Sequence, residues 1–141
     1  YFNDTWEYDC PTCATLEVFG NGCGALYPLT LRSNPPRMGA TWHLTTTFGE
    51  WSPAYTFYFG TTSFSPGINL STLGATGCFV YTSANLGAIG SGIGFGATFA
   101  MPIPYLASLQ GYQMIVQTLV ASSNNPAGFV TSNGLKAVIG Y

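Results

Sequence analysis

The sequence predicts an all-β protein, an antiparallel β-sandwich or jelly roll of about nine strands. Apolar and polar residues alternate with a period of two in most segments. No segment longer than about ten residues shows the 3.6-residue period of an amphipathic helix. Turn-forming residues separate the alternating segments at regular intervals, which is typical of sandwiches and barrels.

In the first half, alternation alone defines the strands. Residues 14–18 alternate apolar and polar side chains, and residues 29–32 alternate two leucines with a threonine and an arginine. Within residues 40–47, Trp42 and its neighbours two apart face one way, while a histidine and threonines face the other. Residues 54–59 alternate aromatic side chains in the same manner.

In the second half, β-branched and aromatic residues add to the pattern. Residues 78–81 form a short β-rich run, and residues 93–101 alternate large apolar residues with glycine, alanine and threonine. A long β-branched run covers residues 112–120. The chain closes with residues 129–131 and 135–139.

Several turn signals are specific enough to test. Ser65-Pro66-Gly67 is expected to be a turn between strands, and Asn133-Gly134 a two-residue hairpin turn. Residues 104–109 are expected to contain one short helical turn.

The composition excludes several functional classes. Lys+Arg 3 and Asp+Glu 5 make up only 6% of the 141 residues, while 47% are hydrophobic. Three basic residues are too few to neutralise a nucleic-acid backbone, so no nucleic-acid partner is expected. No apolar run approaches the roughly 20 residues of a membrane-spanning helix, so no membrane span is expected. Disorder would require less hydrophobicity and more charge.

The charges divide the chain into two parts. Asp4, Glu7, Asp9 and Glu17 give the first 17 residues a charge of −4, whereas the remaining residues carry +2. We therefore expect an acidic N-terminal arm at 1–17 and a single β-sandwich domain at 18–141.

Four cysteines, Cys10, Cys13, Cys23 and Cys78, allow three pairings. Two structural disulfides are the favoured interpretation, because a zinc site recruiting His43 lacks a second ligand pair. In one such arrangement Cys23 and Cys78 close a long loop and Cys10 and Cys13 form a local clip.

An extracellular location is expected. An even cysteine count suits an oxidising compartment. Asn3 and Asn69 begin acceptor patterns for N-glycosylation. The chain starts at Tyr1, so either a signal peptide has been removed or the chain is a fragment of a longer protein.

No catalytic site, metal site or cofactor is expected. His43 is the only histidine, and no nucleophile motif accompanies it. Glycoside hydrolysis requires two carboxylates held about 5 to 10 Å apart. The only clustered acids lie in the arm, and Glu50 stands alone.

The leading hypothesis is a secreted structural protein that self-assembles into an extracellular filament or surface layer. A neutral, strand-rich body tends to associate through its sheet edges. The arm would pack on the next subunit, and the contact residues would be Trp6, Asp4, Glu7, Asp9, Arg32, Arg37 and Lys136. The alternative is a carbohydrate-binding module that stacks sugars on exposed aromatics, using Trp51, Glu50 and Tyr55.

Residues 20–141 also carry a set of short motifs: Gly22-Cys23, Pro28, Gly39, Gly77-Cys78, Ile103-Pro104, Leu109, Gly111, Gln117, Asn124, Ser132-Asn133 and Ile139. In these motifs the chain resembles a Gly-rich β-domain found near the C-termini of secreted bacterial proteins, notably planctomycete-like ones. The resemblance implies an extracellular β-domain in which Cys23 pairs with Cys78. It implies no established activity.

Overall fold

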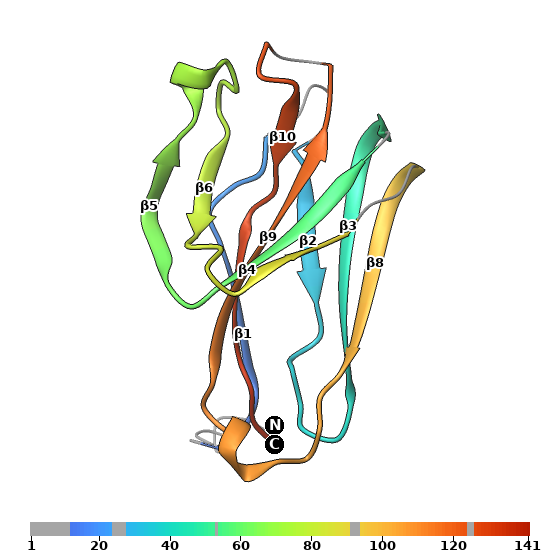
Figure 1. Cartoon of the computed structure of the whole chain (residues 1–141), viewed down its shortest axis with the longest axis vertical. Helices are drawn as coiled ribbons and strands as arrows, with labels where there is room; N and C mark the ends of the chain where they lie inside the picture. The colour runs from blue at the N-terminus through green and yellow to red at the C-terminus, as the bar shows by residue number, and fades with distance from the viewer. Residues whose placement is uncertain (1–11, 24–27, 53, 91–93, 124–125) are drawn as a thin grey trace, which may run out of the picture.

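The computed structural model describes residues 12–23, 28–52, 54–90, 94–123 and 126–141, with the side chains of 48–52 and 94–95 outside that description. The expected all-β fold is confirmed, with eleven strands in the described part, arranged in antiparallel sheets. Figure 1 shows three layers: a hairpin on the left, the largest sheet in the middle and a three-stranded sheet on the right.

The middle layer is a six-stranded sheet. Its order is β1 (Thr15–Phe19), β11 (Gly134–Val138), β9 (Gln113–Ala121), β4 (Tyr55–Gly60) and β7 (Gly87–Ile89). A further strand, β10 (Phe129–Thr131), pairs with the end of β9. β1 and β7 therefore form opposite edges of this sheet.

The two outer layers are smaller. One sheet has the order β2 (Thr30–Ser33), β3 (Thr41–Ser52) and β8 (Gly94–Pro102), and the hairpin consists of β5 (Ser63–Asn69) and β6 (Phe79–Thr82). Two three-residue 3₁₀ segments complete the described elements, at Ser71–Leu73 and Ala107–Leu109. The second of them confirms the helical turn expected within residues 104–109.

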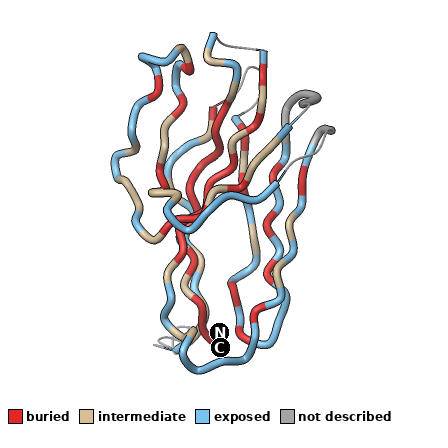
Figure 2. The backbone as a smooth tube through the Cα atoms, viewed as in Figure 1, coloured by how far each residue is buried: buried red, intermediate tan, exposed pale blue. Residues whose placement is uncertain are grey.

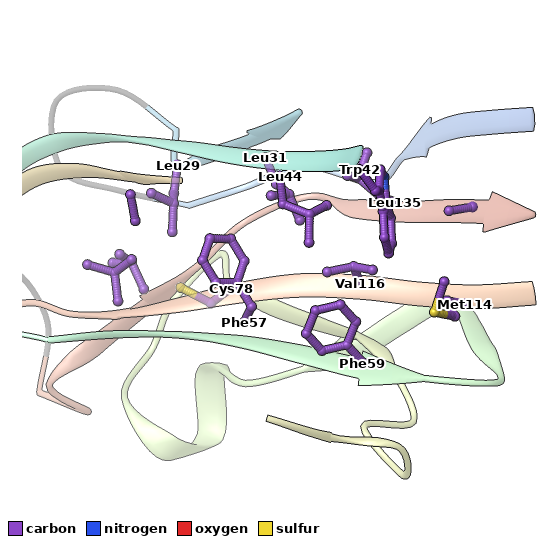
Figure 3. Packing of buried hydrophobic residues seen from close by; sticks show 14 of the residues in the cluster. Leu29, Leu31, Trp42, Leu44, Phe57, Phe59, Cys78, Met114, Val116 and Leu135 are labelled. Carbon is purple, nitrogen blue, oxygen red and sulfur yellow. The ribbon is translucent and has the colours of Figure 1, made fainter. Parts of the chain in front are cut away.

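The hydrophobic core fills the space between the middle sheet and the three-stranded sheet. Trp42 and Leu44 of β3 are fully buried and point toward Phe57 and Phe59 of β4 and Val116 of β9 (Figure 3). Aromatic contacts join the layers: the rings of Trp42 and Phe59 lie 6.4 Å apart in an edge-to-face arrangement. Figure 2 shows the same distribution, with buried residues concentrated in the strands that face each other.

Polar side chains also connect the two sheets of the sandwich. The hydroxyls of Thr46 on β3 and Thr118 on β9 lie 2.8 Å apart, both buried. The side chain of Asn133 accepts a hydrogen bond from the Leu31 N–H at 2.9 Å and donates one to the Leu31 carbonyl at 3.1 Å. A buried polar group that is bonded in this way avoids the cost of desolvation.

The prediction of a hairpin turn at Asn133-Gly134 is wrong. The strands on either side of this dipeptide do not pair with each other; β10 and β11 both pair with β9, at successive stretches of its length. Gly134 also lacks the positive φ that such a turn requires. The dipeptide is a kink between two strands, because the Asn133 side chain reaches across to Leu31.

The β5–β6 hairpin covers part of the other face of the middle sheet. Gln117 of β9 accepts a hydrogen bond from the Tyr81 N–H at 2.8 Å and donates one to the Phe79 carbonyl at 2.6 Å. The Thr82 hydroxyl donates to the Ile115 carbonyl at 2.8 Å. This layer was missed as a hairpin because Ser65-Pro66-Gly67, expected as a turn, lies within β5, in a stretch of shifted register.

Strand β1 crosses the boundary expected between residues 17 and 18. It pairs with β11 over its whole length, and Glu17 lies directly opposite Lys136. The pairing continues beyond the strand, since the Tyr141 N–H donates to the Thr12 carbonyl at 2.8 Å and the Ala14 N–H donates to the Tyr141 carbonyl at 3.1 Å. Residues 12–17 thus belong to the sandwich rather than to the arm.

Candidate assembly interface

A disulfide bond links the first and middle parts of the chain. Cys23 and Cys78 form a disulfide with an S–S distance of 1.93 Å across 55 residues. Both are buried, and the bond joins the segment before β2 to the turn before β6. Cys13 is also disulfide-bonded, while Cys10 lies outside the described residues. A disulfide-bonded chain is compatible with an extracellular location.

The three cations expected in the subunit contact lie on three separate parts of the molecule. Arg32 is exposed on the outer face of β2, beside His43 and Thr45 in a shallow polar hollow of about 500 Å³. Arg37 is exposed, and its backbone forms an isolated parallel β-bridge with Gly140. Lys136 sits on β11 opposite Glu17. The expected arm contacts Asp4, Trp6, Glu7 and Asp9 fall outside the described residues.

The sheet edges of the described structure differ in how they are protected. β1 carries Glu17, β2 has four residues including Arg32, β7 has three residues, and β5 contains Pro66 and a register shift. β8 has nine residues, no charge, and a proline only at its last position. Natural edge strands are shielded by charge, proline, bulges or short length. β6 and β10 are short, with four and three residues. Among the described edge strands β8 is therefore the longest and carries no charge, and its ladder with β3 is regular from Thr41 to Thr47 before the register shifts.

The hydrogen-bonding groups on the open side of β8 can be assigned. The Ile103 N–H donates to the Ala40 carbonyl at 2.9 Å, so this pair is of the hydrogen-bonded kind. Antiparallel pairs alternate between bonded and non-bonded kinds. In the register of β3 and β8, Ala97, Phe99 and Met101 therefore bond to β3. The N–H and C=O groups of Thr98 and Ala100 then face away from the sheet.

An apolar groove meets this open edge at Met101, near the end of β8. It has a volume of about 270 Å³ and lies between the two sheets. The residues that line it are Phe59, Leu86, Gly87, Ala88, Ile89, Met101 and Met114. Leu86 and Ile89, which are 42% and 43% exposed, add large aliphatic surface to the groove. The groove lies where the three-stranded sheet ends while the facing sheet continues to β7.

The edge and the groove together can accept one more strand. An added strand would bond to the outward amides and carbonyls of β8. Its alternate side chains would enter the groove and cover Met101 and Ile89. This acceptor site could not be found from the sequence, because its walls come from separate strands that only the folded sheets bring together. The one signal present was the run of uncharged residues at 93–101.

Of the three residues of the sugar-binding alternative, the structure describes the side chain of Tyr55 alone. Tyr55 is half-buried and packs against the core, with its ring 5.8 Å from that of Phe57. The side chains of Glu50 and Trp51 lie outside the described residues. A different aromatic group is exposed near the end of the chain, where the rings of Tyr105 and Tyr141 lie 5.7 Å apart.

The remaining candidate residues from the sequence are His43, Asn69 and Asn3. His43 is exposed on the outer face of β3, and its backbone N–H donates to the Asn34 side chain at 2.8 Å. Asn69 is exposed at the end of β5, and its side-chain oxygen accepts from the Ser71 N–H at 2.8 Å. Asn3 lies outside the described residues. In the part of the chain that the structure describes, no three His, Cys, Asp or Glu residues gather as metal ligands would.

Comparison with family models, with curated proteins and with solved structures finds no match to this chain. The resemblance to the Gly-rich β-domain of secreted bacterial proteins stays a prediction, although the Cys23–Cys78 bond that it implies is present. No described helix has the length and hydropathy needed to cross a membrane.

Proposed function

We propose that the protein is a secreted structural protein whose copies join edge to edge into an extracellular filament or surface layer. The observation that carries this proposal is the open edge of β8 beside an apolar groove. A long, uncharged edge strand next to exposed aliphatic side chains is a template for association. A chain with 6% charged residues has few means of preventing that association.

The disulfides support the extracellular part of the proposal. Cys13, Cys23 and Cys78 are all bonded, and such bonds persist in oxidising surroundings. Asn69 is exposed and could carry a glycan on the hairpin layer, away from the β8 edge. A glycan there would add solubility without covering the acceptor groove.

The proposal is tested by blocking one amide of the edge. Thr98→Pro removes an N–H that faces away from the sheet and leaves the ladder to β3 intact. We expect at least a tenfold weaker self-association, measured by sedimentation velocity across a concentration series, and loss of filaments in electron microscopy. Thr98→Val is the matched control, since it keeps the N–H and a side chain of similar shape.

Three outcomes are informative. Assembly by the wild type and by Thr98→Val, but not by Thr98→Pro, supports the proposal. Equal assembly by all three would show that the β8 edge is not used. A wild-type protein that stays monomeric at every concentration would refute assembly altogether. Near-ultraviolet circular dichroism verifies that each variant keeps its packed core.

A second candidate function is carbohydrate binding. The exposed pair of Tyr105 and Tyr141 favours it, because aromatic faces stack on the apolar faces of sugars. Glu50 and Trp51 stay candidates for the same role. Binding of a glycan array by the monomer, weakened by Tyr105→Ala or Trp51→Ala, would support this function. An array without signal would remove it.

A further inference from the structure

We propose that the strand added at β8 is the N-terminal segment of a second copy of this chain, residues 1–11, with Trp6 seated in the groove. This inference rests on the proposed function, since it names the partner of the same edge. In this arrangement the open edge of one subunit binds the arm of the next, so the contact is heterologous.

The segment has the pattern that the site requires. In an extended conformation, Phe2, Trp6 and Tyr8 lie on one face together with Asp4 and Cys10. The odd-numbered residues are polar apart from Tyr1 and Pro11. One face would therefore present three large aromatic side chains to the groove. Each buries roughly 150–250 Å² when fully covered.

The groove offers complementary surfaces. Its walls come from both sheets, with Phe59 and Met114 at the buried side and Leu86 and Ile89 at the exposed rim. Methionine side chains adapt their shape and make favourable contacts with aromatic rings. Met101 and Met114 both line the groove.

Charge agrees with the same orientation. When Trp6 points into the groove, Glu7 and Asp9 point to the outer face of the three-stranded sheet. That face carries Arg32 and His43, both exposed. The described side chains of this face include no carboxylate, and Glu50 of β3 lies outside the described side chains.

The topology favours a donor from another copy over the arm of the same copy. Residue 12 is bonded to Tyr141 beside the β1 edge, whereas the groove lies at the β7 edge. Four strand spacings of about 4.8 Å separate these edges, roughly 19 Å in all. Residues 1–11 span at most about 40 Å when extended. Crossing within one copy would use about half of the segment and leave about five residues to pair with the nine of β8, whereas an arm from another copy can pair along its whole length.

Donor and acceptor lie at opposite edges of the molecule, so each contact is heterologous and leaves one arm and one groove unoccupied. Further copies can therefore add to both ends of a dimer. They form a filament when the rotation between neighbours does not close into a ring.

The test uses two full-length variants that fail in different ways. Trp6→Asp damages the donor and keeps the acceptor edge, whereas Thr98→Pro damages the edge and keeps the donor. We expect each variant alone to be monomeric. An equimolar mixture should form a 1:1 heterodimer, observed by native mass spectrometry, with association at least tenfold stronger than in either variant alone.

A peptide of residues 1–9 provides an independent measurement. It should bind the Trp6→Asp variant with a blue shift of its tryptophan fluorescence. It should bind at least tenfold more weakly when Ile89→Arg is added to that variant. A peptide with Trp6→Asp is the matched control and should not compete.

The outcomes separate the inference from the proposed function. If Thr98→Pro blocks assembly but Trp6→Asp assembles normally, the edge is used and the donor is not the arm. If the two variants stay monomeric in the mixture and the peptide does not bind, the arm is likewise excluded as donor. If the wild type does not assemble and the peptide still binds the Trp6→Asp variant, the arm fills the groove of its own copy, and a closed monomer replaces the filament.

Discussion

Two asparagines use their side-chain amides in place of a backbone strand. Asn133 bonds to both polar groups of Leu31 from a buried position. Asn34 bonds to the His43 N–H and, at 3.1 Å, to the Thr41 carbonyl from an exposed position. The chemistry is the same in both places, so the pair separates the effect of burial from the effect of the hydrogen bonds themselves.

Asn133→Ala is expected to lower the free energy of unfolding by about 3 kcal/mol, because it leaves a buried N–H and a buried C=O of Leu31 without partners. Asn34→Ala is expected to cost about 1 kcal/mol or less, since water replaces the lost bonds. Urea denaturation monitored by circular dichroism measures both. Equal losses would show that burial at Leu31 is not decisive.

Such residues also mark the limit of sequence reasoning. The alternation around Trp42 and Phe57 predicted which side chains enter the core, because the pleat of a strand is a local property. Asn133-Gly134 was misread as a hairpin, since the partner of Asn133 lies 102 residues away. The acceptor groove was not predictable, because it is formed by segments brought together only in the folded sheet.

Among the elements, the β5–β6 hairpin is attached to the middle sheet through hydrogen bonds made by β6. Gln117 bonds to β6, and the Tyr81 ring packs edge to face on Phe19 at 5.5 Å. The Cys23–Cys78 disulfide adds a covalent connection at the start of β6. An apolar cavity of about 170 Å³ lies between β6 and the middle sheet, which indicates looser packing than in the sandwich core.

Replacing Cys23 and Cys78 together by alanine is expected to lower the free energy of unfolding by about 4 kcal/mol, since the bond closes a loop of 55 residues in the unfolded chain. The melting temperature should fall by roughly 10 °C. The double variant is preferable to reductant, which would also break the bond of Cys13. An unchanged melting temperature would contradict a stapling role.

Across the whole molecule, the layers are unequal in burial. The strands β9 and β11 are buried along most of their length, whereas β5 is exposed or half-buried throughout (Figure 2). Segments with few buried contacts open with a lower free energy than the core. The sandwich should therefore outlast the hairpin layer when the protein is destabilised.

Native-state hydrogen exchange tests this order. Amides of β5 and β6 are expected to exchange at least tenfold faster than those of β9 and β11. Gln117→Leu should speed exchange further at Tyr81, whose N–H loses its acceptor, and leave the amides of β3 unchanged. Uniform exchange across the three layers would instead indicate a single cooperative unit.

Because Thr12 and Tyr141 are hydrogen-bonded neighbours, the order of the strands along the chain can be permuted. A short linker could join these two positions, and new termini could be opened in the exposed loop at residues 85–86. Domains whose ends lie close together tolerate such circular permutation. The permuted protein should keep its core and can be inserted as a cassette into a loop of a carrier protein.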